Sequence, residues 1–182
     1  MNDIQIRFYE RDDAPALYEA AMESVSDVYQ WLPWCHPEYN MTETEEWLAD
    51  QVQKRQDGME FQFLISDSRG TFLGGCGLNQ IDWERKIANL GYWIRSSAMG
   101  QGIAVKAVEL LSNWCFEHTD LITLEIKCAV GNVRSQRVAE KAAAVREGIR
   151  PSCLEIHGKK HDAVIFSIQK GKTPNKVNAA DG

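Results

Sequence analysis

The sequence has no long apolar run and no excess of basic residues, and these two absences exclude several classes of protein. No apolar stretch approaches the roughly 20 residues that span a bilayer, and the opening residues MNDIQIRFYERDD are too polar and acidic for a secretory signal. The 182 residues carry 26 acidic and 20 basic side chains, a net charge of −6, whereas nucleic-acid binding requires a basic face. We expect a cytoplasmic protein without nucleic-acid or membrane partners, and the acidic balance leaves room for a basic peptide or a cationic amine.

Cysteine and histidine are few and show no ligand pattern. The five cysteines form no CxxC pair, so neither disulfides nor a zinc ribbon is indicated. His157 and His161 stand four residues apart, a metal-ligand spacing on a helix, but Gly158 between them indicates a hairpin turn. Because no second ligand pair accompanies them, we expect no metal site.

Hydrophobic periodicity predicts one α/β domain over residues 1–170 and a polar, disordered tail over residues 171–182. A strand is followed by two helices, the first capped by Asp12 or Asp13 and the second opened by a capping box of Thr42 and Glu45. The remaining segments predict a three-stranded antiparallel meander, then a helix, a strand and a helix, and finally a closing hairpin. Their expected ranges are 4–9, 11–25, 41–56, 61–67, 71–82, 86–95, 103–117, 121–130, 132–144, 146–158 and 159–169.

A short loop with two glycines, SAMGQGIA at residues 97–104, connects a strand to an amphipathic helix. The first amide groups of a helix have no partner within the helix, so such a start binds anions, and glycine lets the backbone approach them. A Walker loop, GxxxxGK[ST], is absent, and Val105 stands where a dinucleotide-binding fingerprint needs its third glycine. The loop is therefore either a different phosphate site or a plain strand-to-helix turn.

Several segments together resemble the GNAT superfamily of acetyl-CoA-dependent N-acetyltransferases, and most closely its ribosomal-protein N-terminal (RimJ/RimL-type) branch. The phosphate loop of that family, Arg/Gln-x-x-Gly-x-Gly/Ala, is matched at Gly100 and Gly102, with Ser97 in place of the Arg or Gln. The resemblance implies a single-domain α/β fold with a mixed central sheet of about seven strands and about four flanking helices. The other matching segments, in the family's order, are WLPWCHPEYNMTETEEWL, LGYWI, GNVRSQRVAEKAAAVREGIR and GKKHDAVIFSI.

The resemblance implies acetyl transfer from acetyl-CoA to a primary amine by direct attack, without a covalent enzyme intermediate. Backbone groups of 92–94 would contact the pantetheine and the carbonyl, loop amides would hold the pyrophosphate, and Asn132 would anchor the pantetheine, a role compatible with capping its helix. The implied cofactor-binding residues are Tyr92, Trp93, Ile94, Met99, Gly100, Gln101, Gly102, Ile103, Ala104 and Asn132.

The resemblance also implies an acid and an acceptor pocket. Ser135 is the candidate that protonates the leaving thiolate; alternatively, it is an incidental polar residue in a first helical turn. The tryptophans near residues 31–40 are either a stacking box for a planar acceptor or a packed lid. The implied acceptor-binding residues are Trp31, Trp34, His36, Tyr39 and Asn79.

Two departures from the family pattern bear on catalysis and on a helix end. Ala143 and Ala144 replace a Gly-Phe pair, which we expect to loosen the end of the preceding helix. Asn89 replaces a glutamate that often orders the water that removes the amine proton, and an amide is no base at neutral pH. Glu155 is a candidate base and His36 is another. The alternative for each is an ordinary polar side chain without a catalytic role.

The identity of the acceptor follows in part from the missing glutamate. About a quarter of an α-amine with a pKa near 7.7–8 is neutral at pH 7.4, against about one lysine in a thousand. The sequence therefore favours the N-terminal amine of a ribosomal or other protein. A small amine such as an antibiotic or an aminoacyl nucleotide, or a non-catalytic acyl-CoA-binding module, remains an alternative. We expect a monomer or a homodimer.

Overall fold

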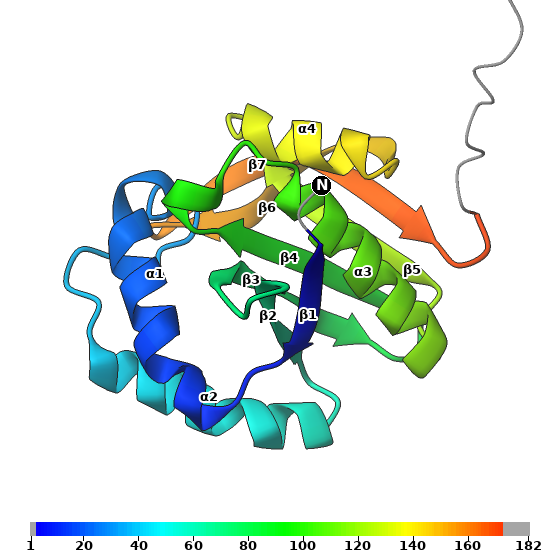
Figure 1. Cartoon of the computed structure of the whole chain (residues 1–182). Coiled ribbons are helices and arrows are strands. Elements are labelled where there is room, and N and C mark those ends of the chain that lie inside the picture. Colours follow the sequence, from blue (N-terminus) through cyan, green and yellow to red (C-terminus); the bar gives the residue numbers. More distant parts are fainter. Residues whose placement is uncertain (1–2, 173–182) are drawn as a thin grey trace, which may run out of the picture.

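A computed structural model of the chain describes residues 3–172, so the predicted disordered tail lies, from residue 173, outside the described residues. The predicted order of strands and helices is confirmed (Figure 1). Two short 3-10 helices, Arg11–Asp13 and Ser96–Ala98, accompany the main elements. The main elements are β1 (Ile4–Phe8), α1 (Ala14–Val28), α2 (Met41–Gln56), β2 (Phe61–Asp67), β3 (Phe72–Asp82), β4 (Ile87–Ile94), α3 (Ile103–His118), β5 (Thr123–Ala129), α4 (Val133–Lys141), β6 (Val145–Ile156) and β7 (Lys159–Gln169).

One mixed sheet of seven strands, in the order β1-β2-β3-β4-β5-β7-β6, organises the domain. The predicted meander is confirmed, because β2, β3 and β4 pair antiparallel through short turns. Only β4 and β5 are parallel, since α3 connects them as a crossover helix. The expected mixed sheet with four flanking helices is therefore the observed fold.

Helices cover both faces of the sheet because its strands alternate their side chains. Phe63 and Ile65 of β2 pack in the larger core with α3 and the inner side of α4, whereas Leu64 packs with α1 and α2. Figure 1 shows α3 crossing one face, with α1 and α2 set to the side beyond β1. Within residues 3–172, no helix is long and apolar enough to cross a membrane.

The predicted helix caps were wrong in detail. The cap of α2 is Asn40, whose Oδ1 accepts a hydrogen bond from the Glu43 amide at 3.2 Å, so the box of Thr42 and Glu45 is not used. At α1, the Asp13 side chain makes no capping bond. It instead accepts two hydrogen bonds from the Arg7 guanidinium, at 2.8 and 2.6 Å. Asp13 thus occupies the N-cap position of α1, as predicted, but without a capping bond from its side chain, and the cap of α2 lies two residues before the predicted Thr42.

The end of α4 is closed rather than loosened. The Ala144 amide donates to the Ala139 carbonyl and the Ala143 amide to the Glu140 carbonyl, both at 3.0 Å, which is the Schellman pattern. This pattern requires a left-handed residue at its turn, and Ala143 has φ of +59°. The cost of replacing the family's glycine therefore falls on the backbone of Ala143.

We expect Ala143→Gly to stabilise the protein by about 0.5–1 kcal/mol, since a side chain in the left-handed region costs about 1–2 kcal/mol and glycine returns part of this as entropy. The melting temperature should rise by about 1–3 °C in a thermal scan. Ala142→Gly is the matched control, because Ala142 has φ of −78° and should lose stability. Equal effects of both changes would show that strain at Ala143 is absent.

Candidate active site

The parallel strands β4 and β5 separate in the middle of the sheet. They pair only from Ile87–Thr123 to Asn89–Glu125. Beyond this point β4 stays paired with β3 as far as Ile94, and β5 with β7 as far as Ala129. The side of β4 that faces β5 is therefore an open strand edge, whose backbone groups can bind an amide-bearing chain.

The opening between the two strands is a cleft of about 600 Å³, which we call the splay cleft. Its walls come from β4, β5, the glycine loop, the start of α3, α4 and the end of β6. Gln101 lies outside its lining, and its side-chain amide donates to the Ser97 carbonyl at 3.3 Å. The structure places the following predicted cofactor residues in its walls: Tyr92, Trp93, Ile94, Met99, Gly100, Gly102, Ile103, Ala104 and Asn132.

The glycine loop presents uncapped helix amides to this cleft. Gly100 and Gly102 have φ of +76° and +78°, and a Cβ on either would have no heavy atom within 4 Å. Helix α3 begins directly after Gly102, and no side chain caps it. Its first amides therefore remain available to an anion, which the helix dipole also favours.

Helix α1 fixes the position of this loop. The Glu23 carboxylate accepts hydrogen bonds from the Arg95 guanidinium and, at 2.7 Å, from the Ser97 amide. The Arg95 bond is the main cause that lowers the pKa of Glu23 to about 2. The Ser96 amide donates to the Ser24 hydroxyl at 3.0 Å. The loop is thus tied to α1 at two successive residues.

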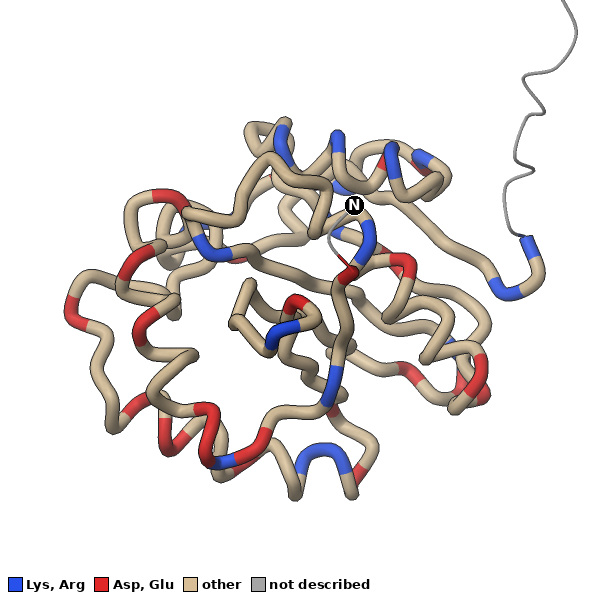
Figure 2. The backbone as a smooth tube through the Cα atoms, in the orientation of Figure 1, with Lys and Arg blue, Asp and Glu red and all other residues tan. Residues whose placement is uncertain are grey.

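Four cations in the splay cleft were missed by the sequence analysis. Figure 2 shows basic residues along α4. Three of them follow a spacing of three and four, which places them on one helix face, and this spacing was the available signal. The cations that line the cleft are Lys127, Arg134, Arg137 and Lys141. Together with the loop amides they form an electropositive wall suited to several phosphates.

Tyr92 and Ser135 form a hydrogen-bonded pair inside the cleft. Their hydroxyl oxygens are 2.9 Å apart, and the Tyr92 hydroxyl also donates to the Ser135 carbonyl at 3.1 Å. The Ser135 amide donates to Asn132 Oδ1 at 3.1 Å, so Asn132 does cap α4. Burial raises the pKa of Tyr92, which keeps the phenol protonated. The pair can therefore pass a proton to a group in the cleft.

Two amides stand where the strands part. Asn89 Nδ2 donates to Asn79 Oδ1 at 2.9 Å across β3 and β4. Asn89 Oδ1 is buried and, within residues 3–172, has no hydrogen-bond partner. A buried acceptor without a partner is costly, so this oxygen can accept a hydrogen bond from a ligand.

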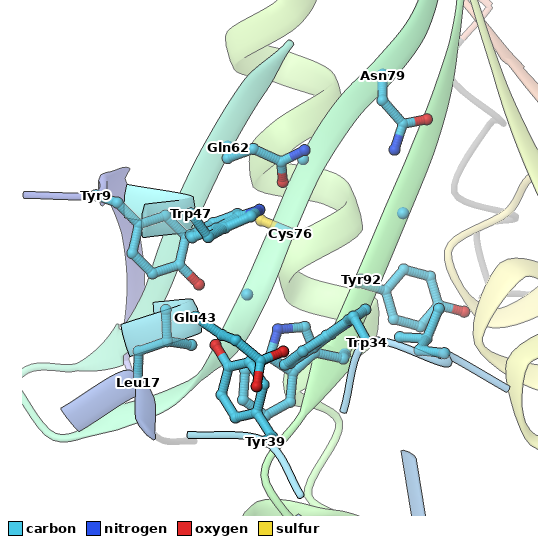
Figure 3. A pocket seen from close by; sticks show the side chains of 15 residues that line it. Tyr9, Leu17, Trp34, Tyr39, Glu43, Trp47, Gln62, Cys76, Asn79 and Tyr92 are labelled. Atoms are coloured by element: carbon cyan, nitrogen blue, oxygen red, sulfur yellow. The ribbon is translucent and has the colours of Figure 1, made fainter. Parts of the chain in front are cut away.

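A second cavity, of about 440 Å³, lies beside the same strand, and we call it the aromatic cavity (Figure 3). Of the predicted acceptor residues, Trp34, Tyr39 and Asn79 line it, while Trp31 lines the splay cleft. His36 lines neither cavity. The cavity walls that sequence analysis missed include Glu43 and Trp47 of α2, Gln62 of β2 and Tyr9 of the segment after β1.

The two cavities meet along β4. Both are lined by Leu32, Asn79, Gly91, Tyr92 and Trp93. A Cβ added at Gly91 would have no heavy atom within 4 Å, so no side chain closes the passage at that position. The predicted base Glu155 lines the splay cleft from β6 and is exposed. Two molecules can therefore be bound at once, one in each cavity, with reacting groups meeting at β4.

Comparisons with known proteins agree with this architecture. The family model described as "Acetyltransferase (GNAT) domain" matches residues 3–145. YdaF of Bacillus subtilis strain 168, provisionally named a ribosomal N-acetyltransferase, is 31% identical over 170 residues, which cover 92% of this chain and 91% of YdaF. The ribosomal-protein-serine acetyltransferase of Escherichia coli K12 is 28% identical over 132 residues, covering 72% of this chain and 73% of the relative.

A solved structure shows the same fold around a bound cofactor. RimL, a ribosomal L7/L12 α-N-protein acetyltransferase in complex with coenzyme A, superimposes with a TM-score of 0.82 and 26% identity, over 91% of this chain and 93% of RimL. The open edge of β4, the uncapped amides of α3 and the cations of α4 fit the amide groups and phosphates of such a ligand. The chain belongs to the GNAT acetyltransferase family and is an acetyl-CoA-dependent N-acetyltransferase.

Proposed function

We propose that the protein acetylates the N-terminal α-amino group of a protein in the cytoplasm, with ribosomal proteins as the first class to test. The observation that carries this proposal is the composition of the shared wall. The five residues that line both cavities include no carboxylate and no histidine, and the position next to them carries Asn89. Such a junction suits an amine that is already partly neutral. The relatives are named as ribosomal acetyltransferases, and RimL, whose structure is similar, is an α-N-protein acetyltransferase.

Acetyl-CoA would lie in the splay cleft. The amides at the start of α3 would hold its pyrophosphate, the α4 cations its phosphate charge, and the free edge of β4 its pantetheine amides. Gly91 leaves the passage beside the thioester open to the acceptor. Acetyl-CoA supplies an acyl group on a good leaving group. The chain's own residues would position the thioester and protonate the sulfur that leaves.

Transfer would be direct. The amine nitrogen attacks the thioester carbonyl carbon, a C–N bond forms, and the C–S bond breaks with its electron pair going to sulfur. Ser135 donates a proton to that sulfur and is reprotonated through solvent, while Tyr92 orients its hydroxyl. The proton lost by the amine passes to water. Two carboxylates line the splay cleft, Asp27 and Glu155, and we propose that Glu155 assists this last step.

The class of amine follows from the fraction of each amine that is unprotonated at neutral pH. An α-amine is neutral in about a quarter of molecules at pH 7.4, whereas a lysine side chain is neutral in about one in a thousand. Without a strong base at the junction, this difference of a few hundredfold becomes a difference in rate. The protein is therefore expected to modify α-amines and to leave lysines of the same peptide unmodified.

A coenzyme A release assay tests the proposal. Peptides with free Ser, Ala or Met N-termini and one internal lysine are compared with the same peptides blocked at the N-terminus, and mass spectrometry locates the acetyl group. We expect turnover of the free peptides alone, with the label on the α-nitrogen. Acetylation of the internal lysine, or of aminoglycosides and aminoacyl adenylate mimics but no peptide, would contradict the proposal. Binding of acetyl-CoA without turnover on any amine would indicate a non-catalytic module.

A further inference from the structure

The aromatic cavity contains one charged side chain. Among residues 3–172, Glu43 is the only carboxylate that lines the cavity, and no lysine, arginine or histidine of this part of the chain lines it. Its other walls are apolar or aromatic apart from two amides, Gln62 and Asn79. A carboxylate among ring faces attracts a cation through both the charge and the ring quadrupoles, and it repels an anion. The cavity is therefore built for a positively charged group.

Glu43 is held in place as a carboxylate. The Asn40 side-chain amide donates to its Oε1 at 2.6 Å, and His36 Nε2 lies 3.0 Å from its Oε2. Glu43 also lies in the first turn of α2, where the helix dipole favours a negative charge. A carboxylate has about four acceptor sites, so these two contacts leave room for a ligand. His36, predicted to bind the acceptor and also a candidate base, lines neither cavity and contacts Glu43.

The aromatic rings around Glu43 are packed against one another. Trp34 contacts Tyr39 and Trp93 edge-on, with ring centroids 5.6 and 5.3 Å apart, and Tyr39 is fixed by the Thr44 hydroxyl at 2.9 Å. Of the two alternatives, a stacking box and a packed lid, the edge-on packing of Trp34 favours the packed lid. Rigid rings lose little freedom when a ligand binds, which favours a defined binding site.

Glu43 lies away from the place where the amine reacts. Figure 3 shows Asn79 at one end of the aromatic cavity and Glu43, with Tyr39 and Trp34, at the other. The reacting amine must reach the shared wall at Asn79 and Gly91. Glu43 is thus positioned for a second group of the acceptor. The segment that contains α1 and α2 is acidic, since residues 10–57 hold twelve acidic and three basic side chains (Figure 2).

Building on the function proposed above, we propose that the aromatic cavity selects acceptors with a second positive charge, which Glu43 binds. For a protein acceptor, this means an N-terminus with lysine or arginine among its first two residues. The amine at the shared wall and the cation at Glu43 then fix the acceptor at both ends. An aminoacyl nucleotide, whose phosphate is negative, is disfavoured at the same place.

Peptides that differ at one position test this selection. Steady-state rates are measured for peptides with Arg, Gln or Glu at residue 1 or at residue 2, with an otherwise identical sequence. We expect kcat/KM of the wild type to be about tenfold higher with Arg than with Gln at one of these positions, and lowest with Glu, mainly through KM. Equal values for the three peptides at both positions would overturn the proposal.

Variants of α2 separate the role of Glu43 from that of general charge. Glu43→Gln should remove the preference for Arg, so that the Arg and Gln peptides give equal kcat/KM in this variant, and Glu43→Lys should reverse the order towards Glu. Glu46→Gln, an exposed carboxylate on the same helix outside both cavities, is the matched control and should keep the preference. A preference for Arg that survives Glu43→Gln, with an unchanged thermal transition, would assign the selection elsewhere.

The two proposals fail in different ways. If peptides are acetylated at the α-nitrogen without regard to charge, only the role of Glu43 is wrong. If no peptide reacts but linear diamines release coenzyme A in a Glu43-dependent manner, the cation site stands and the protein N-terminus is wrong. If neither class reacts, both proposals are wrong.

Discussion

Gly102→Asp is expected to raise the Kd for acetyl-CoA by about 30-fold or more. The new carboxylate would stand directly before the uncapped amides of α3, in the space that the cofactor's phosphates would occupy. Two like charges about 4 Å apart repel by about 4 kcal/mol at an effective dielectric constant of 20, and half of this already corresponds to about 30-fold. A negative charge at a helix start does not destabilise the helix, so the fold should be retained.

Gly102→Asn is the matched control for this experiment. Asparagine has nearly the shape of aspartate and, like it, tolerates the left-handed conformation at φ of +78°, but it carries no charge. Isothermal titration with coenzyme A should therefore show a small loss of affinity for Asn and a large loss for Asp. A large loss with both variants would assign the effect to shape or strain. Unchanged affinity with Asp would show that the phosphates of the cofactor do not bind at this loop.

Ser135→Ala is expected to lower kcat by about 100-fold, the lower range for loss of a general acid, with little change in the Kd for acetyl-CoA. The change is structurally mild, because the Tyr92 hydroxyl keeps its second hydrogen bond, to the Ser135 backbone carbonyl at 3.1 Å. The ring therefore remains anchored while the side-chain hydroxyl is lost. Single-turnover measurements with saturating acetyl-CoA report the chemical step directly.

Tyr92→Phe identifies which hydroxyl of the pair donates the proton. If Ser135 is the donor and Tyr92 only orients it, the phenylalanine variant should lose less rate than Ser135→Ala. A full loss in Tyr92→Phe together with wild-type turnover in Ser135→Ala would transfer the acid role to the phenol, whose pKa is raised by burial. Normal turnover in both variants would leave the thiolate to be protonated by water.

The architecture could be predicted from the sequence because its signals are local. The alternation of β2 to β4 and the face of α3 each lie within one segment, and the glycines of the loop stand next to the helix that they open. The expectation of one mixed sheet of about seven strands came from resemblance, and the order of the strands within the sheet was not predicted. Local chemistry was also less certain at the caps, where Asn40 with Glu43 and Thr42 with Glu45 both fit the same pattern and packing chose the first.

The aromatic cavity could not be predicted because its walls meet only in the folded sheet. Tyr9, Trp47 and Gln62 are far apart in sequence, and the register of β2 on β3 places Gln62 opposite Gly77, where a Cβ would approach Gln62 Oε1 to 2.0 Å. A glycine in β3 is thus the partner of a glutamine in β2, a relation with no local signal. The cations of α4 were missed for another reason: individually, each resembles an ordinary solvated side chain.

The two cavities share β4, but their other walls come from different parts of the chain. These parts can therefore change independently in evolution. Apart from the shared strand, the aromatic cavity is built mainly from residues 9–79 and the splay cleft mainly from residues 89–156. Substitutions in residues 34–78, none of which lines the splay cleft, can change acceptor binding without altering the walls of the donor site. Such a division explains how one donor-binding half can serve relatives with different acceptors, and it makes the segment from α2 to β3 the natural target for redesign.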